Sequence, residues 1–228
     1  AIPKHTGAAT AYWVAEGSAP TESQQTIGQI AMTPKTLGAF TDYTRKLLLQ
    51  SAIDIETFVR GDFSQIMAIE MDRVVLYGLG ASGEPKGIQN WADVNTTSFS
   101  TSATPTWAEI VDMEGDVAAD NALMGSLAYA THPTVRANMK TTSKAGTEAI
   151  FVMGDDGTLN GYPALVSTQI TSTHVWFGNW ADAIVGRWGG VDVLVDPYTA
   201  STTGTIRIVI FQSADVAVRH GQSFSLGS

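Results

Sequence analysis

DIETFVRGDFSQIMAIEMDRVVLYGLGASGEPKGI, residues 54–88, is the stretch that decides the fold of this chain of 228 residues. Its apolar residues recur at steps of three and four, which places them on one face of a helix from about residue 56 to residue 78. Gly61 lies inside that helix and marks a weak point that allows a bend or the start of a second short helix. The predicted apolar face consists of Phe63, Ile66, Met67, Met71, Val74 and Val75.

Both ends of this helix carry signals. Residues 51–54 form an N-terminal signal, in which Asp54 suits the positive end of the helix dipole. Gly78 and Gly80 stand where a left-handed C-terminal cap is expected, and Pro85 prevents the helix from restarting. The sequence therefore predicts one long helix with a glycine-rich exit.

The exit also matches a phosphate-binding pattern, because residues 78–83 read Gly-Leu-Gly-Ala-Ser-Gly. A dinucleotide site needs G-x-G-x-x-G after a strand and at the start of a helix, where amide groups face the phosphates. Here the glycines follow a helix, whose terminal carbonyl groups carry partial negative charge and repel phosphate. We interpret them as a stop signal and expect no nucleotide cofactor.

The composition excludes several classes of protein. There are 13 basic and 22 acidic residues, a formal charge of −9, which argues against a nucleic-acid-binding face. The chain has no cysteine, so disulfides and thiolate metal sites are excluded. Its four histidines are far apart in sequence, and no stretch has the length and apolar character of a membrane span. We expect no metal, no cofactor and no membrane partner.

The N-terminal region, residues 9–49, has an extended pattern. Residues 11–14 and 26–32 are rich in strand formers, and a long polar loop separates them. The pattern predicts a projecting hairpin, which cannot bury two faces by itself and needs a surface to lie on.

The remainder mixes helices and strands. Residues 92–105 form a polar joint, Thr106 and Glu109 have the spacing of a capping box for a helix to about Ala119, and His132-Pro133 begins another helix. Residues 154–157 form a turn. The expected strands are residues 126–130, 162–166, 175–178, 183–186, 191–195, 206–211 and 216–218. This order predicts an α+β fold rather than an alternating parallel-sheet enzyme.

No catalytic constellation emerges from the residue types. Glu70 and Asp72 point about 200° apart on a helix, so each is expected to be a solvated or interface-facing acid. Asp155-Asp156-Gly157 lacks the remaining ligands of a calcium loop and is interpreted as a turn. His174, beside Val175-Trp176, is expected to pack near a strand. We predict no catalytic residue and no enzymatic activity.

Six segments, taken in order, carry a family resemblance. They are residues 13–17 with Lys35 and 37–39; residues 70–88; His132-Pro133 with the following helix; Leu159-x-Gly161-x-Pro163; residues 182–185; and residues 193–198. Together they resemble the major capsid proteins of tailed bacteriophages, which have the Hong Kong phage capsid fold. The resemblance covers nearly the whole chain.

The resemblance implies three parts. These are an extended loop (residues 1–36), a peripheral domain built on the long spine helix (residues 37–104 and 187–215) and an axial domain (residues 105–186 and 216–228). It implies a subunit that self-assembles into hexamers and pentamers of an icosahedral shell, made in the bacterial cytoplasm and enclosing double-stranded DNA. It also implies scaffolding, protease, portal and decoration proteins as further partners.

Two features depart from the family pattern. The chain starts almost at the extended loop, so we expect a processed form or a fragment without the family's N-terminal arm. Some relatives join subunits by an isopeptide bond from a lysine in this loop, but Gln29 stands at the expected position, and we predict no crosslink. Two alternatives stay open, an encapsulin-like bacterial shell protein and an α+β enzyme with an unrecognised site.

Overall fold

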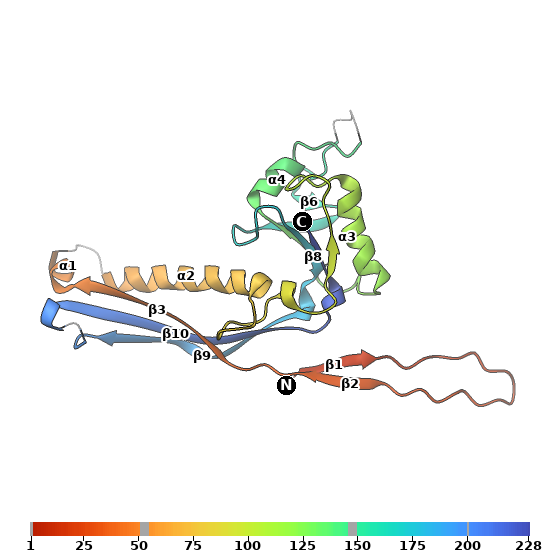
Figure 1. The fold of residues 1–228 in the computed structure, drawn as a ribbon, viewed down its shortest axis with the longest axis horizontal. Helices are drawn as coiled ribbons and strands as arrows, with labels where there is room; N and C mark the ends of the chain where they lie inside the picture. The colour runs from red at the N-terminus through yellow and green to blue at the C-terminus, as the bar shows by residue number, and fades with distance from the viewer. Residues whose placement is uncertain (1, 51–54, 146–149, 200) are drawn as a thin grey trace. The chain divides into compact units, whose positions relative to one another are not determined.

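The protein is described by a computed structural model that covers residues 2–50, 55–145, 150–199 and 201–228. Its internal contacts divide the chain into two compact units, Ala1–Thr33 and Pro34–Ser228. In the first unit, β1 (Ile2–Gly7) and β2 (Thr26–Ile30) pair antiparallel, with Ile2 opposite Ile30 (Figure 1). This unit is the predicted hairpin.

The hairpin differs from the prediction in its first strand. The sequence predicts that strand at residues 11–14, but these residues have no strand partner, and β1 begins at Ile2. Beyond the ladder, the amide of Thr10 donates to Ser23 Oγ at 2.9 Å, and a turn closes between Ala15 and Ser18. Strand formers favour a strand only when neighbouring side chains pack on them, and the loop offers Trp13 no neighbour.

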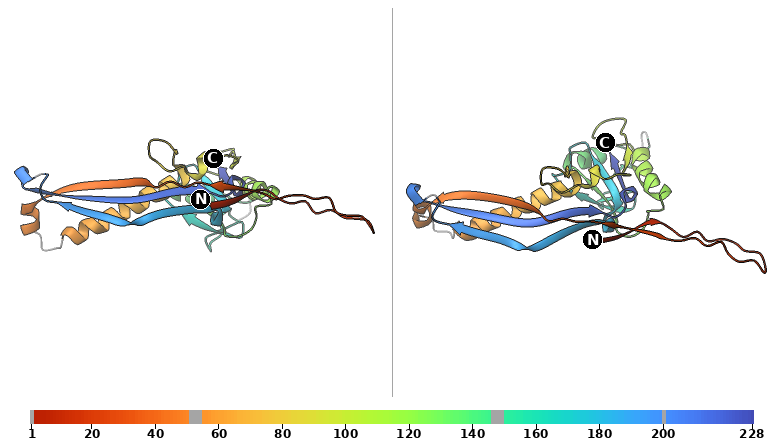
Figure 2. Two further views of the ribbon diagram at one scale, coloured as in Figure 1. Left: turned by 90° about the horizontal axis from the view of Figure 1, so that it is seen from below. Right: turned by 60° about the horizontal axis from the view of Figure 1, so that its bottom comes forward.

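The second unit contains a three-stranded antiparallel sheet in the order β3-β10-β9. Its strands are β3 (Lys35–Thr44), β9 (Ala183–Asp196) and β10 (Thr205–Val218). The long helix α2 (Ile55–Tyr77) runs along this sheet in every view (Figures 1 and 2). The expected extended stretch stops earlier than residue 49, because α1 (Arg45–Gln50) follows β3 directly.

A small core joins α2 to the sheet. Phe63 and Met67 on the helix are buried against Ile208 and Ile210 on β10. Burying each of these side chains contributes about 1.5–3 kcal/mol. Ile66 is predicted on this face but is 46% exposed. At about 100° per residue it lies about 60° from Phe63 on the side away from Met67, and so about 100° from Met67.

The ends of α2 meet the predictions in part. The N-terminal signal at residues 51–54 lies outside the described residues. The helix continues through Gly61 as regular α-helix and ends at Tyr77. The left-handed cap predicted at Gly78 is wrong, since the first residue with positive φ after the helix is Gly80, at 71°.

The rest of the second unit is built on a six-stranded mixed sheet in the order β4-β11-β8-β5-β7-β6. Its strands are β4 (Asn95–Thr97), β5 (Leu127–Thr131), β6 (Thr158–Leu159), β7 (Tyr162–Val166), β8 (Val175–Asn179) and β11 (Phe224–Gly227). The strands expected at residues 126–130, 162–166 and 175–178 are therefore confirmed. The polar joint predicted at residues 92–105 is not entirely loop, because it contains β4, which pairs parallel with β11.

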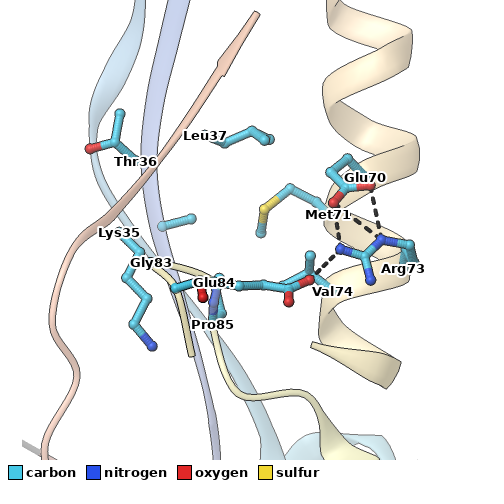
Figure 3. Close-up of a pocket in the computed structure, with 12 residues that line it drawn as sticks. Lys35, Thr36, Leu37, Glu70, Met71, Arg73, Val74, Gly83, Glu84 and Pro85 are labelled. Atoms are coloured by element: carbon cyan, nitrogen blue, oxygen red, sulfur yellow. Dashed lines mark hydrogen bonds and ion pairs between the residues drawn. The ribbon is translucent and has the colours of Figure 1, made fainter. Parts of the chain in front are cut away.

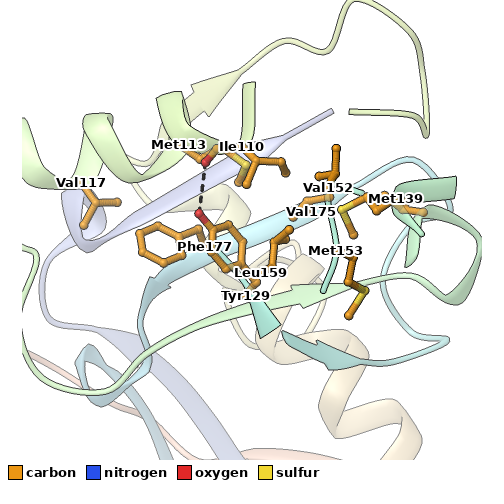
Figure 4. Packing of buried hydrophobic residues seen from close by; sticks show 11 residues of the cluster. Ile110, Met113, Val117, Tyr129, Met139, Val152, Met153, Leu159, Val175 and Phe177 are labelled. Atoms are coloured by element: carbon orange, nitrogen blue, oxygen red, sulfur yellow. Dashed lines mark hydrogen bonds between the residues drawn. The ribbon is translucent and has the colours of Figure 1, made fainter. Parts of the chain in front are cut away.

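Two predicted helices cover one face of this sheet. Helix α3 (Trp107–Ala119) begins at the predicted capping box, in which Thr106 Oγ1 accepts from the Glu109 amide and Glu109 accepts from the Thr106 amide. Helix α4 (Pro133–Met139) has His132 as its N-cap. Figure 4 shows their core, where the Tyr129 hydroxyl donates to the Ile110 carbonyl at 3.1 Å. Its buried members are Ile110, Met113, Val117, Tyr129, Val135, Met139, Val152, Met153, Leu159, Val175 and Phe177.

A further core links the two sheets. The four late strands predicted separately form two long ones, because residues 183–186 and 191–195 belong to β9, while residues 206–211 and 216–218 belong to β10. Val218, at the end of β10, is buried with Leu76 of α2 and Trp176 of β8. The short 3₁₀ helices are η1 (Ile88–Asn90), η2 (Trp180–Asp182), η3 (Ser201–Thr203) and η4 (Gly221–Ser223). Among the described residues, no helix has both the length and the apolar character needed to cross a membrane.

Candidate assembly surfaces

The hairpin has almost no core of its own. Among its side chains whose burial is described, Ile30 is the one that is buried. Trp13 is fully exposed, and Ile27 on β2 is 67% exposed. Exposed apolar side chains on a two-stranded ribbon leave it dependent on another surface for stability.

The three-stranded sheet is apolar on both faces. Leu37 and Ala39 of β3 point toward α2. Phe40 is the next residue along the strand, so its side chain points to the opposite face. Phe40 pairs across the sheet with Val209, and Val209 pairs with Leu194. Because directly paired residues project from the same face of a sheet, these three side chains form one row.

The face of the sheet opposite α2 is therefore a candidate binding surface, which we call the outer face. Phe40 is 64% and Leu194 is 59% exposed, and Phe211 and Trp188 are partly exposed beside them. We define the outer face by Phe40, Trp188, Leu194, Val209 and Phe211. A connected apolar surface of this kind is characteristic of a protein–protein interface.

Charged groups border the outer face. Arg207 pairs in register with Asp42 on one side and Asp196 on the other. Its Nε and Nη2 atoms donate to the two Asp42 oxygens at 2.7 Å each, and its guanidinium lies 4.9 Å from the centre of the Phe40 ring. The hydrogen bonds from Arg207 lower the pKa of Asp42. This bidentate pair fixes the guanidinium over the edge of the apolar row.

A second ion-pair group holds the exit of α2. Figure 3 shows Arg73 between Glu70 and Glu84, with Nη2 donating to Glu70 Oε1 at 2.6 Å and also to Glu84. Glu84 Oε2 accepts from the Leu79 amide at 3.2 Å. The hydrogen bond from Arg73 is the largest cause of the lowered pKa of Glu84. The sequence predicts a solvated or interface-facing acid at Glu70. In the structure Glu70 instead pairs with Arg73, which forms a clamp between α2 and the loop that follows it.

This clamp borders a cavity of about 380 Å³ between α2, β3 and the glycine-rich exit. Leu37, Met71 and Pro85 give it apolar walls (Figure 3). Lys35 lies at its edge, with Nζ 3.5 Å from Asp215 Oδ1. The cations around the cavity therefore already have carboxylate partners inside the chain.

The glycine-rich exit has the orientation deduced from the sequence. Residues 78–83 follow the C-terminus of α2, and the amide of Gly78 donates to the Val74 carbonyl at 2.9 Å. The Glu84 carboxylate lies beside these glycines and accepts from the Leu79 amide at 3.2 Å. An anionic phosphate would meet like charge there.

The other candidate residues have structural partners. Asp156 Oδ1 accepts from the amide and hydroxyl of Thr158, at 3.0 and 2.8 Å, within the predicted turn. His174 lies just before β8, half-buried, as predicted. Asp72, two residues beyond Glu70, is exposed on α2. Among the described side chains, no group of three or more His, Asp or Glu residues is placed to bind a metal ion.

Gln29, the position at which the resemblance would place a crosslinking lysine, lies exposed on β2 opposite Pro3. Nothing in this placement tests the expected absence of a crosslink, which stays a prediction. Sequence reasoning missed the outer face and the Arg73 clamp. The sequence of β3 does contain a signal for the outer face. The exposed side of a half-buried strand is expected to be polar, and Phe40 is a large apolar residue on that side.

Solved structures with the same fold include chains of capsids and of phages. The capsid of a native GTA particle superposes with a TM-score of 0.80 at 15% identity, over 99% of this chain and 83% of that one. A chain of Microbacterium phage Oxtober96 gives a TM-score of 0.76 at 15% identity, over 100% of this chain and 84% of that one. The α+β capsid fold expected from the sequence is confirmed.

The family follows from the sequence itself. The sequence model of the phage capsid family matches residues 1–228, so the chain belongs to that family. The major capsid protein of Halomonas phage phiHAP-1 is 31% identical over 226 residues, which are 99% of this chain. The chain spans 37% of the length of that relative.

Proposed function

We propose that this chain is the structural, non-enzymatic subunit of an icosahedral phage or prophage shell, which self-assembles into hexamers and pentamers around double-stranded DNA. Family membership and the capsid fold support a structural role in a virion. Family membership favours it over an encapsulin-like shell, and the family and the fold together favour it over an α+β enzyme. Assembly in the host cytoplasm belongs to the same proposal.

One observation carries the proposal, namely the hairpin without a core of its own. Ordering its backbone costs about 1–2 kcal/mol per residue, and a single buried isoleucine does not offset that cost. A surface on a neighbouring copy would supply the missing burial. Trp13 and Ile27 are the most exposed of its large apolar side chains, and the hairpin would bind through them.

The outer face is the surface that we assign to receive the hairpin. It presents exposed apolar side chains from three paired strands, which match an amphipathic ribbon in chemistry. A hairpin binding to a different surface on the next copy makes a heterologous contact, and such contacts close into rings when the rotation allows it. Rings of six and five copies are the units of the proposed shell.

We also propose the domain assignment implied by the family. The extended loop would comprise residues 1–36, the peripheral domain residues 37–104 and 187–215, and the axial domain residues 105–186 and 216–228. The support is that α2 packs on the β3-β10-β9 sheet, whereas α3 and α4 pack on the six-stranded sheet. Scaffolding, protease, portal and decoration proteins would be further partners, and the DNA would be held by enclosure, since the chain carries a net charge of −9.

A complementation experiment tests the hairpin contact. A hairpin variant, Trp13→Ser with Ile27→Ser, keeps the outer face, and a face variant, Phe40→Ser with Leu194→Ser, keeps the hairpin. Each alone is expected to stay monomeric in sedimentation velocity, while an equimolar mixture forms one-to-one dimers, because one intact hairpin meets one intact face.

Circular dichroism of each variant checks that it has folded. The paired variants Glu22→Gln and Asp155→Asn, at exposed polar positions, serve as the control and are expected to assemble like the wild type. If both apolar variants assemble normally, or if the mixture stays monomeric although both are folded, the assigned contact is wrong.

A further inference from the structure

The last residue of α2 is tied to the loop before β8. The Tyr77 hydroxyl lies 3.1 Å from the Thr171 amide nitrogen, 3.2 Å from Trp176 Nε1 and 3.1 Å from His174 Nδ1. These three groups all belong to residues 171–176, which lead from the loop into β8. One hydroxyl therefore joins the long helix to the six-stranded sheet.

The donors and acceptors around the Tyr77 hydroxyl determine the protonation state of His174. A backbone amide and an indole N–H can only donate, so Thr171 and Trp176 occupy the two lone pairs of the Tyr77 oxygen. The single hydroxyl proton is then left for His174, whose Nδ1 must accept it. The imidazole is consequently neutral, with its proton on Nε2.

Protonation of His174 removes that acceptor. An imidazolium ion carries an N–H on both nitrogens, so its Nδ1 would present a third donor to an oxygen that already accepts two bonds. The hydroxyl proton of Tyr77 would lose its acceptor at the same time. At least one of the three contacts must then break.

The surroundings of His174 favour the neutral ring. Tyr77 on α2 is the titratable group in contact with it, and the loop residues 167–173 and Trp176 on β8 carry no charge. Burial is the cause that lowers the pKa of His174, and no charged group contributes to the change. Next to the contact, Leu76, Ile170 and Trp176 form part of one buried core.

We propose that the Tyr77–His174 contact is a pH-sensitive latch between the C-terminal end of α2 and the loop before β8. The latch is closed while His174 is neutral and opens when the ring is protonated. This goes beyond the proposed function, since the latch lies within one chain and does not depend on assembly. Through the latch, the pH of the surroundings controls how firmly the end of α2 is held to the six-stranded sheet.

Hydrogen exchange followed by mass spectrometry tests the latch. Exchange of peptides covering residues 167–178 is measured at pH 8 and pH 5, after correction for the intrinsic pH dependence of exchange. The wild type is expected to exchange about three to ten times faster at pH 5 in this segment, a change of about 0.6–1.4 kcal/mol in opening free energy.

Matched variants separate the latch from general acid loosening. In His174→Asn, the side-chain oxygen can accept from Tyr77 at either pH, so the corrected rates are expected to be equal. Tyr77→Phe removes the hydroxyl and is expected to exchange fast at both pH values. His132→Asn, which replaces a histidine at the N-cap of α4 by another good cap, should keep the wild-type response.

The proposal is overturned by equal corrected rates in the wild type at the two pH values. It is also overturned if His174→Asn keeps the full response to pH. Should Tyr77→Phe fail to fold by circular dichroism, the comparison of the wild type with His174→Asn still decides the outcome.

Discussion

The backbones of Gly78 and Gly87 touch. The amide of Gly87 donates to the Gly78 carbonyl at 2.8 Å, which fastens the end of α2 to the segment before η1. A Cβ atom on Gly87 would lie 2.4 Å from the Gly78 nitrogen, and one on Gly78 would lie 2.3 Å from the Pro85 carbonyl oxygen. Glycine is needed at both positions because any Cβ atom would collide with the other segment. A left-handed conformation is not the reason, since neither residue has a positive φ.

Substitution of Gly87 by alanine is therefore expected to destabilise the subunit. The new methyl group would meet backbone atoms, which cannot move aside as a flexible side chain does. We expect Gly87→Ala to lower the free energy of unfolding by about 2 kcal/mol or more, measured by urea denaturation.

Gly115→Ala provides the control for this substitution. Gly115 lies in α3, where an added methyl group would meet no atom within 4 Å, so alanine should raise stability by about 0.5–1 kcal/mol. Equal stability of Gly87→Ala and the wild type would show that the two segments do not approach as described.

The clamp on Arg73 predicts a pH dependence of stability. Since the folded-state pKa of Glu84 is below its unfolded value, its contribution is present above about pH 4.5 and is lost as the pH falls through the folded pKa. Because the group is near the surface, we expect less than about 1 kcal/mol. Urea titrations of the wild type and Glu84→Gln should differ at pH 7, and the difference should shrink as the pH falls below about 4.5. A difference that is unchanged at pH 3 would rule out this ion pair as its cause.

The two faces of the three-stranded sheet should respond differently to truncation. Ile208 is fully buried against α2, so Ile208→Ala is expected to cost about 2–4 kcal/mol of unfolding free energy. Phe40→Ser on the outer face should change it by less than about 1 kcal/mol, yet weaken assembly. Thermal unfolding and sedimentation of the same samples measure both effects. A Phe40→Ser subunit that loses stability as Ile208→Ala does would place Phe40 in the core of the subunit.

Assembled particles are expected to contain no covalent bonds between subunits at the position of Gln29. A glutamine side chain offers no nucleophilic amine for an isopeptide bond, and no lysine lies between residues 5 and 34. A denaturing gel of purified particles should show a single band at the mass of one subunit. A ladder of multiples would contradict this.

Local signals in the sequence predict much of the fold. The capping box at Thr106 and the proline after His132 place the starts of α3 and α4, because their partners lie within three residues. The alternation of the late strands is visible too. The continuity of β9 and β10 is not visible. β9 runs through an irregular segment between the paired residues Trp188 and Asp192, where Gly189 has a φ of 71°, and β10 continues through Ser213, which pairs with residues on both neighbouring strands.

The candidate surfaces are harder to predict because they depend on distant segments. Trp13 has high strand propensity, but the ladder between β1 and β2 ends before reaching it. Phe40 and Leu194 are far apart in the chain and become neighbours only through Val209. Arg73 finds Glu84 because the chain turns back after Gly80, which no helical spacing reveals.

Electron microscopy of the gene product that contains this chain, expressed with its neighbouring genes and imaged in negative stain, tests the central claim most directly. We predict closed icosahedral shells for the wild type and none for the variant with Trp13→Ser and Ile27→Ser. A wild-type protein that stays strictly monomeric at high concentration would contradict the proposed role.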